Sequence, residues 1–314
     1  MINAHNNLIA RLARGVLIFG LVLCTAVVAI AAVFAAPGDH SLDDIRQQAT
    51  IKSSYNFSPL PPNSGKGIIV AIVSQGISQS IKDRLGNRLS AYSVLPGDTS
   101  PYDEGSGLSS VGTECVSLVG ALAPHAQIIA VKAMDSDGGG SYADIRNGIT
   151  RATELGAKII VLPISARDDD AGVGRAIDAA LKKGLLVVAA AANNNSYGAE
   201  FPARMDGVVA VGATDAQDKV AYFSNYGGKI IYAPGVNINV WGKSTGSSGT
   251  THASAVAGAI FVVLWSQNPG MSRQRLVDAV IGSAKEITAR DGGSARLING
   301  QAALKAIKRP AKGK

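Results

Sequence analysis

Five short apolar runs constrain the fold of this chain more than any other feature. They are rich in Val, Ile, Leu and Ala and lie at residues 67–73, 127–131, 158–162, 185–190 and 208–211. Helical patterns separate some of them, for example at 142–155 and 171–183. Because continuous apolar strands alternating with helices are typical of a parallel sheet covered on both faces, we predict an α/β domain.

The chain divides near residue 65. Residues 66–308 carry the strand and helix patterns, and this length suits one α/β domain with a substantial core. Residues 37–65 mix charged residues, Gln and Pro with little periodicity, except near 41–50. We therefore predict that 37–65 is a tether with one short helix, and that residues 309–314 form a basic tail.

Residues 15–36 contain no charged side chain and are long enough to cross a bilayer. Arg11 and Arg14 precede them and Asp39 follows. This charge asymmetry predicts a single-pass anchor in the cell membrane, with a cytoplasmic stub at the N-terminus and the domain outside the cytoplasm. Residues 1–36 also fit a signal sequence, whose cleavage near 33–35 would give a secreted protein.

A glycine-bracketed run at 249–258 reads Gly-Thr-Thr-His-Ala-Ser-Ala-Val-Ala-Gly and predicts a tight helix start. Three blocks precede it: Val-Ala-Ile-Val-Ser-Gln-Gly-Ile at 70–77, Val-Gly-Thr-Glu-Cys-Val at 111–116 and Val-Val-Ala-Ala-Ala-Ala-Asn at 187–193. In this order and spacing, the four blocks resemble those of subtilisin-like serine peptidases over roughly residues 66–305.

This resemblance implies a subtilisin-like three-layer fold with a degenerate catalytic triad. Ser74 stands where the family has its aspartate, Val111 where it has its histidine and Thr251 where it has its serine. Asn193 matches the asparagine that helps to bind the oxyanion. A hydroxyl is a weak nucleophile without a histidine base and an orienting carboxylate, so we expect a pseudopeptidase with no catalytic residue. Such a membrane-tethered domain would bind a protein or peptide partner, or act as a structural subunit.

The segment that grips the peptide substrate in this family also differs. The matching stretch is Pro163-Ile164-Ser165. Family members bind the peptide there as an added strand, and a proline has no N–H to donate to such a ladder. The resemblance therefore implies an altered substrate groove.

An alternative is an active serine-type endopeptidase, or another hydrolase, with an unconventional site around Thr251, Glu114 or His252. Successive positions of a helix point about 100° apart, so we expect His252 to be misaligned with Thr251 and to have a capping or surface role. Glu114 lies near the acid of the related sedolisins, but Leu118 stands where their aspartate belongs. We therefore expect Glu114 to be an exposed helix residue.

No metal, cofactor or nucleic acid is indicated. The net charge is +7, but aromatic residues make up 5 % and no nucleic-acid motif accompanies the charge. The acids at 168–170 precede a helix, whose positive end explains them, and Ser141 is a predicted helix cap. Cys24 lies in the apolar segment and Cys115 on a predicted core helix, so we expect no disulfide between them. We expect Cys115 to be a buried, inert thiol.

Overall fold

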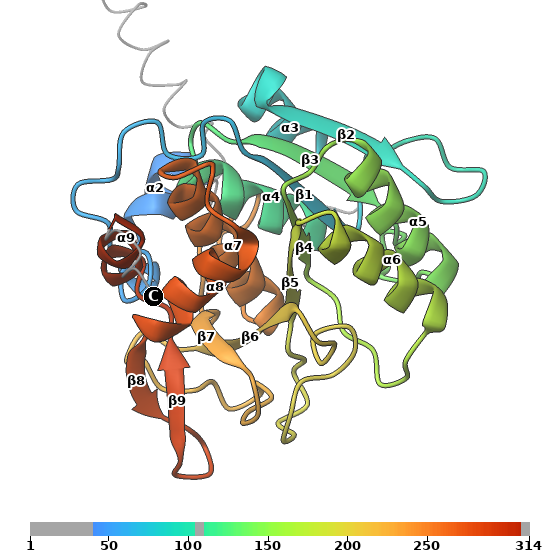
Figure 1. The fold of residues 1–314 in the computed structure, drawn as a ribbon. Coiled ribbons are helices and arrows are strands. Elements are labelled where there is room, and N and C mark those ends of the chain that lie inside the picture. The colour runs from blue at the N-terminus through green and yellow to red at the C-terminus, as the bar shows by residue number, and fades with distance from the viewer. Residues whose placement is uncertain (1–39, 104–109, 309–314) are drawn as a thin grey trace, which may run out of the picture. The chain divides into compact units, whose positions relative to one another are not determined.

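The computed structural model describes residues 40–103 and 110–308. In these residues nine strands form one sheet, in the order β2-β3-β1-β4-β5-β6-β7-β9-β8 (Figure 1). The strands are β1 (Ile69–Ser74), β2 (Leu89–Ser93), β3 (Gln127–Lys132), β4 (Ile159–Leu162), β5 (Leu186–Ala190), β6 (Val208–Thr214), β7 (Ile231–Pro234), β8 (Lys285–Thr288) and β9 (Ser294–Leu297). Each neighbouring pair is parallel, apart from the antiparallel pair β8 and β9.

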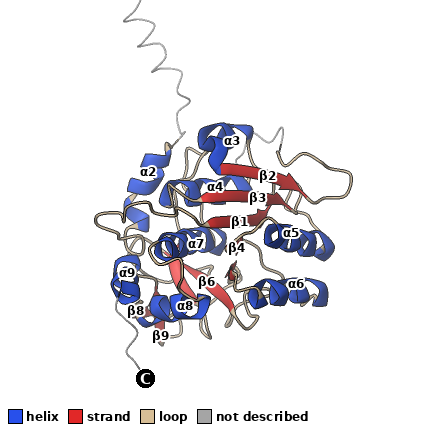
Figure 2. Cartoon of the chain, turned by 45° about the horizontal axis from the view of Figure 1, so that its top comes forward, coloured by secondary structure: helices blue, strands red, loops and turns tan. Residues whose placement is uncertain are grey.

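Helices cover both faces of this sheet, as Figure 2 shows for α5 and α6 on one side and α7 on the other. The α-helices are α2 (Leu42–Gln47), α3 (Gln79–Leu85), α4 (Val111–Leu122), α5 (Tyr142–Glu154), α6 (Ala171–Lys182), α7 (Thr250–Ser266), α8 (Arg273–Gly282) and α9 (Gly300–Lys308). Two short 3-10 helices, η1 (Ala49–Ile51) and η2 (Gly86–Arg88), complete the description. The predicted α/β architecture with a mainly parallel sheet is confirmed.

The two faces of β1 show why its sequence is apolar at every position. Val70 and Ile72 belong to the core that includes residues of α4 and α7. Ala71 and Val73 belong to the core that includes residues of α5 and α6. Since successive side chains of a strand point to opposite faces, a strand covered on both sides has no position for a polar residue. The strand is consequently a rigid support for the residues that follow it.

Helix α7 runs through the middle of the molecule. It is apolar all round, as expected of a helix that is buried on every side. Gly258 allows this close packing, because a Cβ at that position would lie only 2.6 Å from Cγ2 of Val161 on β4. The approach fixes the position of the helix and therefore of its first turn, where the candidate site lies.

The segment before β1 contains the short helix predicted near 41–50, α2, but it corrects the prediction of a tether at 37–65. Within its described part, residues 40–65, Ile45 and Ile51 are fully buried, and the Tyr55 hydroxyl donates to the Leu122 carbonyl. Ser41 starts α2 with a capping box, in which its hydroxyl accepts from the N–H of Asp44. A few well-placed apolar residues thus dock this segment on α4, although its overall composition is that of a linker.

The predicted stub and anchor at 1–36, residues 37–39 and the basic tail at 309–314 lie outside the described residues. Within the described ranges 40–103 and 110–308, none of the helices has both the length and the apolar character that a membrane crossing requires. The membrane anchor and the location of the domain therefore stay predictions.

Candidate active site

The carboxyl ends of the parallel strands place Ser74 and Asn193 at one edge of the sheet. Ser74 ends β1, and Asn193 follows the end of β5. Helix α4 begins against the turn after Ser74, where the side-chain oxygen of Gln75 accepts from the N–H of Val111 at 2.8 Å. Ligands of open α/β sheets bind at such edges, so this is the natural place for a functional site.

The first turn of α7 meets the same edge. Oδ1 of Asn193 accepts from the N–H of Thr250 at 2.9 Å and from its hydroxyl at 3.0 Å. The Cys115 thiol of α4 lies 3.9 Å from the carbonyl oxygen of Thr251. Ser74 and Val111 thus lie by the start of α4, and Asn193 and Thr251 by the start of α7, a helix that packs against α4.

Ser74, Val111 and Thr251 offer two hydroxyls and an isopropyl group. Ser74 is buried, with 1 % of its surface exposed. Neither Ser74 nor Val111 provides a carboxylate or an imidazole, so proton transfer from Thr251 through these two positions is chemically unavailable. A reaction at Thr251 would need a base from elsewhere.

An imidazole and a carboxylate do meet in this site, and their positions correct two predictions. Glu114 is not an exposed helix residue: only 2 % of it is accessible, and its Oε2 lies 2.5 Å from Nε2 of His252. His252 is 5 % exposed and therefore has no surface role. The capping role is also wrong, because Gly249 is the N-cap of α7 and Asn193, rather than His252, accepts from the N–H of Thr250. Figure 1 shows α4 and α7, which carry this pair, side by side.

The direction of the His252 ring explains why helical spacing alone was misleading. Helical side chains lean back toward the N-terminus, so the ring reaches over the preceding turn. A methyl group added at Gly249 would lie 3.5 Å from Nδ1 of His252, 3.6 Å from Oγ1 of Thr251 and 3.7 Å from Nδ2 of Asn193. Nδ1 is buried and has no hydrogen-bond partner within the described residues. A basic nitrogen, a hydroxyl and an amide donor therefore surround one small space.

Lys243 completes a charge network behind this space. Its Nζ lies 2.5 Å from Oε1 of Glu114 and donates to Oγ of Ser247 at 3.1 Å. Burial acts to raise the pKa of Glu114, but the hydrogen bonds from His252 and Lys243 and the positive charge beside the carboxylate outweigh it and hold that pKa below its ordinary value. Glu114 is thus an ionised carboxylate at neutral pH. The sequence held no signal for Lys243, which lies far from α4 along the chain.

The Cys115 thiol is buried, as predicted. Burial, and secondly the negative charge of Glu114, raise its pKa well above the ordinary value. The thiolate is the nucleophilic form of cysteine, so Cys115 contributes packing rather than chemistry.

The acidic residues considered from the sequence have structural contacts. Ser141 caps α5, as predicted, and Asp170 caps α6 through a hydrogen bond from the N–H of Val173 at 2.7 Å. Asp169 pairs with Arg204 at 2.8 Å. Across the described residues 40–103 and 110–308, no three His, Cys, Asp or Glu side chains are arranged to hold a metal ion.

The segment Pro163-Ile164-Ser165 follows β4 at the same edge of the sheet. Pro163 is buried, whereas Ile164 and Ser165 line a cavity of about 340 Å³. Its other walls are mainly apolar and come from α5, α6 and the loops beside them: Met134, Gly138, Gly140, Tyr142, Ile145, Ala166, Val173, Phe201 and Pro202. The predicted change in substrate binding at 163–165 stays a prediction.

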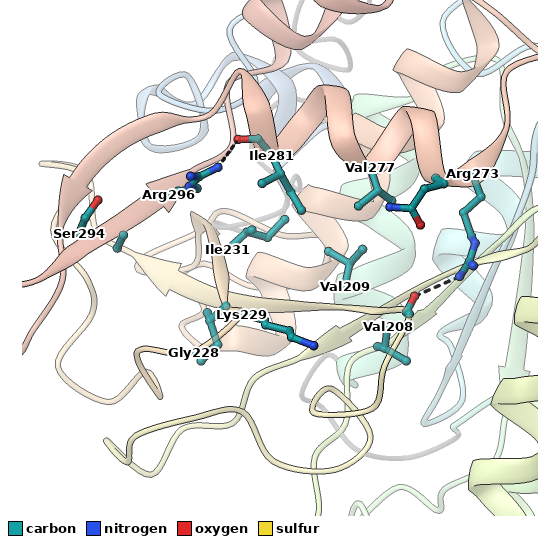
Figure 3. Close-up of a pocket in the computed structure, with 14 residues that line it drawn as sticks. Val208, Val209, Gly228, Lys229, Ile231, Arg273, Val277, Ile281, Ser294 and Arg296 are labelled. Carbon is teal, nitrogen blue, oxygen red and sulfur yellow. Dashed lines mark hydrogen bonds between the residues drawn. The ribbon is translucent and has the colours of Figure 1, made fainter. Parts of the chain in front are cut away.

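A second cavity, of about 420 Å³, lies at the opposite edge of the sheet, where β6 and β7 begin (Figure 3). Val209, Ile231 and Val277 form part of its wall. The two arginines on its rim are already engaged, since Arg273 donates to the carbonyl of Gly207 and Arg296 to that of Ile281, both at 3.2 Å. This cavity is separate from the site around Thr251.

Comparison with known proteins gives the same family as the four sequence blocks. The Subtilase family (Peptidase_S8) model matches residues 65–301. Thermitase from Thermoactinomyces vulgaris is 32 % identical over 214 residues, which cover 62 % of this chain and 75 % of thermitase. Subtilisin BL from Lederbergia lenta is 34 % identical over 253 residues, which cover 77 % of this chain and 92 % of that protein.

Solved structures agree. The prenylagaramide maturation protease PagA has a TM-score of 0.65 and 25 % identity, over 77 % of this chain and 93 % of that one. A cold-adapted subtilisin-like serine proteinase shares the fold, with a TM-score of 0.67 and 20 % identity over 80 % of this chain and 97 % of that one. With the family model matching most of the chain, and with the parallel sheet and central helix described above, the chain belongs to the subtilase family.

Proposed function

We propose that this subtilase is a peptide hydrolase with an unconventional active site, in which Thr251 is the nucleophile and His252 the general base. The observation that carries this proposal is the buried Glu114–His252 pair beside Thr251, which leaves Nδ1 of His252 without a partner. Similar proteins from Alkalihalobacillus alcalophilus and Shouchella clausii are named alkaline protease, and a hydrolytic function is consistent with that likeness. This reverses our expectation of an inactive domain.

Four residues of the candidate site each have one role in the proposed hydrolysis. The Thr251 hydroxyl gives its proton to Nδ1 of His252 while Oγ1 bonds to the substrate carbonyl carbon. Glu114 accepts the Nε2–H of His252 and stabilises the imidazolium that forms. Nδ2 of Asn193 stabilises the carbonyl oxygen as it becomes negative. His252 then protonates the departing amine as the C–N bond breaks, and water releases the acyl group and restores the Thr251 hydroxyl.

The Thr251 hydroxyl and Nδ1 of His252 face the same space, but no hydrogen bond joins them in the described part of the chain. Catalytic hydrogen bonds are often long without substrate and tighten when it binds. The mainly apolar cavity beside Ile164 and Ser165 lies at the same edge of the sheet, where it can take an apolar side chain of an extended peptide. A polypeptide with apolar residues is therefore the substrate class that we propose.

A casein digestion assay and labelling with a serine-directed fluorophosphonate test this function on the full-length chain. We expect both signals in the wild type and neither in Thr251→Ala. His252→Gln should lower kcat by about 10²- to 10⁴-fold, the usual contribution of a general base. Thr251→Ser, which keeps the hydroxyl, is the matched control and should retain labelling and digestion.

A second candidate is favoured by one specific observation, the absence of carboxylate and imidazole groups at Ser74 and Val111. In that case the domain binds a protein or peptide partner without cleaving it. Wild-type protein that neither digests casein nor labels, yet binds an apolar peptide with micromolar affinity, would establish this function instead. Digestion that persists in Thr251→Ala would contradict the role proposed for that residue.

We further propose that residues 15–36 anchor the domain to the outer side of the cell membrane. The uncharged run and the arginines before it support this orientation. Carbonate extraction of membranes distinguishes an anchor, which stays in the pellet, from a cleaved signal sequence, which leaves the domain in the secreted fraction.

A further inference from the structure

One buried carboxylate faces two bases in the candidate site. Glu114 on α4 binds His252 through Oε2 and Lys243 through Oε1, both at 2.5 Å. The Glu114 side chain is 2 % exposed and that of Lys243 is 29 % exposed. The Lys243 head is therefore inside the site, although its side chain retains some contact with solvent.

General electrostatics indicates which of Glu114, Lys243 and His252 carry a charge. A buried carboxylate without a compensating positive charge is costly, whereas a second positive charge beside it adds repulsion. Lysine is a stronger base than histidine by about four orders of magnitude, so it takes the proton first when both share one carboxylate. Cys115, the neighbour of Glu114 in the chain, is a buried neutral thiol that supplies no charge.

We propose that Lys243 is a positioning residue that neutralises Glu114 and thereby keeps His252 uncharged, with its proton on Nε2 and a free lone pair on Nδ1. In this form the imidazole can accept a proton from Thr251. Without Lys243, the same carboxylate would draw a second proton onto His252, and Nδ1 would become a donor that cannot serve as a base. The catalytic part of this inference rests on the proposed hydrolase function, but the protonation state of His252 does not.

The backbone around Lys243 is built to hold its ammonium group in place. Ser247, whose hydroxyl accepts from Nζ, pairs with Ile238 through two backbone hydrogen bonds of 2.8 Å. Next to it, the hydroxyl of Ser248 accepts from the N–H of Asn237 at 2.9 Å. These bonds close the segment between β7 and α7, so that the lysine and the first turn of α7 are fixed by one loop.

Nitrogen-15 NMR of the histidine rings at pH 7 tests the inference on the full-length chain. The signals of His252 are identified by their loss in His252→Gln. We expect one protonated and one lone-pair nitrogen in the wild type, and two protonated nitrogens in most molecules of Lys243→Met. Lys243→Gln keeps a hydrogen-bond donor without the charge and should behave like Lys243→Met. Lys243→Arg keeps the charge and should preserve the wild-type signals.

Hydrolysis gives the second readout. Lys243→Met and Lys243→Gln should lower kcat at pH 7 by about tenfold with KM unchanged, because the base is protonated in most molecules. Lys243→Arg should recover most of this loss. Lys229→Met, which removes an exposed lysine far from the site, is the control and should leave kcat unchanged. Thermal unfolding of each variant verifies that it is folded.

The two proposals fail in different ways. A wild-type chain that does not hydrolyse peptides, but whose His252 gains the second proton in Lys243→Gln, would overturn the proposed function and support the role of Lys243. Identical nitrogen signals in the wild type, Lys243→Met and Lys243→Gln would overturn the role of Lys243, whatever the activity.

Discussion

Two charge clusters with buried members are built in opposite ways. In the first, the acid Glu114 is shared by the bases Lys243 and His252. In the second, the base Lys132 is shared by two acids: its Nζ lies 2.8 Å from Asp98 and 3.2 Å from Asp103. Lys132 ends β3, directly beside Ser74 in the register of the sheet.

The difference shows which cluster is suited to chemistry. Lys132, the base of the second cluster, pairs with both acids and also donates to the carbonyl of Tyr102 at 3.3 Å. The first cluster has a base to spare, since one ring nitrogen of His252 is buried without a partner and faces the Thr251 hydroxyl. Both carboxylate oxygens of Asp103 are also buried without a hydrogen-bond partner among the described residues, but it is the free nitrogen of His252 that shares a space with the candidate nucleophile Thr251.

The largest expected effect concerns stability, and it separates the two clusters. Lys132→Met leaves the carboxylate of Asp103, 2 % exposed, without its counter-charge. Removing one partner of a buried pair costs about 3 kcal/mol or more in free energy of unfolding. Lys243→Met should cost only about 1 kcal/mol, because His252 can still compensate Glu114. Urea denaturation of the full-length variants measures both values.

The double variant Lys132→Met with Asp103→Leu provides the control for that prediction. It removes the buried charge along with its partner and should recover part of the lost free energy of unfolding. Equal losses in Lys132→Met and Lys243→Met would mean that the spare base gives the first cluster no advantage, and would break the comparison.

The second-largest expected effect is on the pH dependence of stability, because the two clusters lose their contributions at opposite ends of the pH range. The folded-state pKa of Glu114 lies below its ordinary value of 4.5, so its contribution to stability is present above about pH 4.5 and is lost as the pH falls through the folded-state pKa. For Lys132, burial lowers the pKa, but bonding to Asp98 and Asp103 outweighs it and raises the pKa above 10.5. Its contribution is complete below pH 10.5 and is lost as the pH rises through the folded-state pKa.

Urea denaturation between pH 3 and pH 6 tests the part of this prediction that concerns Glu114. Glu114→Gln should have a lower free energy of unfolding at pH 6 and a flatter decline toward pH 3 than the wild type. Parallel curves for the two proteins would show that Glu114 titrates alike in the folded and unfolded chain, and that His252 and Lys243 do not stabilise its charge.

Five of the nine strands in the described residues, β1, β3, β4, β5 and β6, and the start of the central helix could be predicted from the sequence because their signals are local. The run at 185–190 is apolar throughout, and β5 (Leu186–Ala190) lies within one residue of it. The docked segment at 40–65 could not be predicted, because Ile45 and Ile51 are isolated apolar residues in a polar stretch. Their burial depends on the surface of α4, which the local sequence does not reveal.

The candidate site was only half predictable for the same reason. The positions of Asn193 and Thr251 followed from motif order, since parallel strands end at one edge. The contact of Glu114 with His252 joins two helices that are 138 residues apart in the chain. Whether His252 points to solvent or back over its own first turn depends on that contact, and helical spacing gave the wrong answer.

The smallest expected effect is at an ion pair with no burial at all. Lys229 and Asp206 lie 2.8 Å apart, but their side chains are 89 % and 94 % exposed. Water solvates both charges in the folded and the unfolded chain, and salt screens their attraction. Lys229→Met should therefore leave the urea midpoint unchanged at low and at physiological salt. A loss comparable to that of Lys132→Met would mean that proximity alone, rather than burial, sets the strength of the charge clusters, and the contrast between Glu114 and Lys132 would have no physical basis.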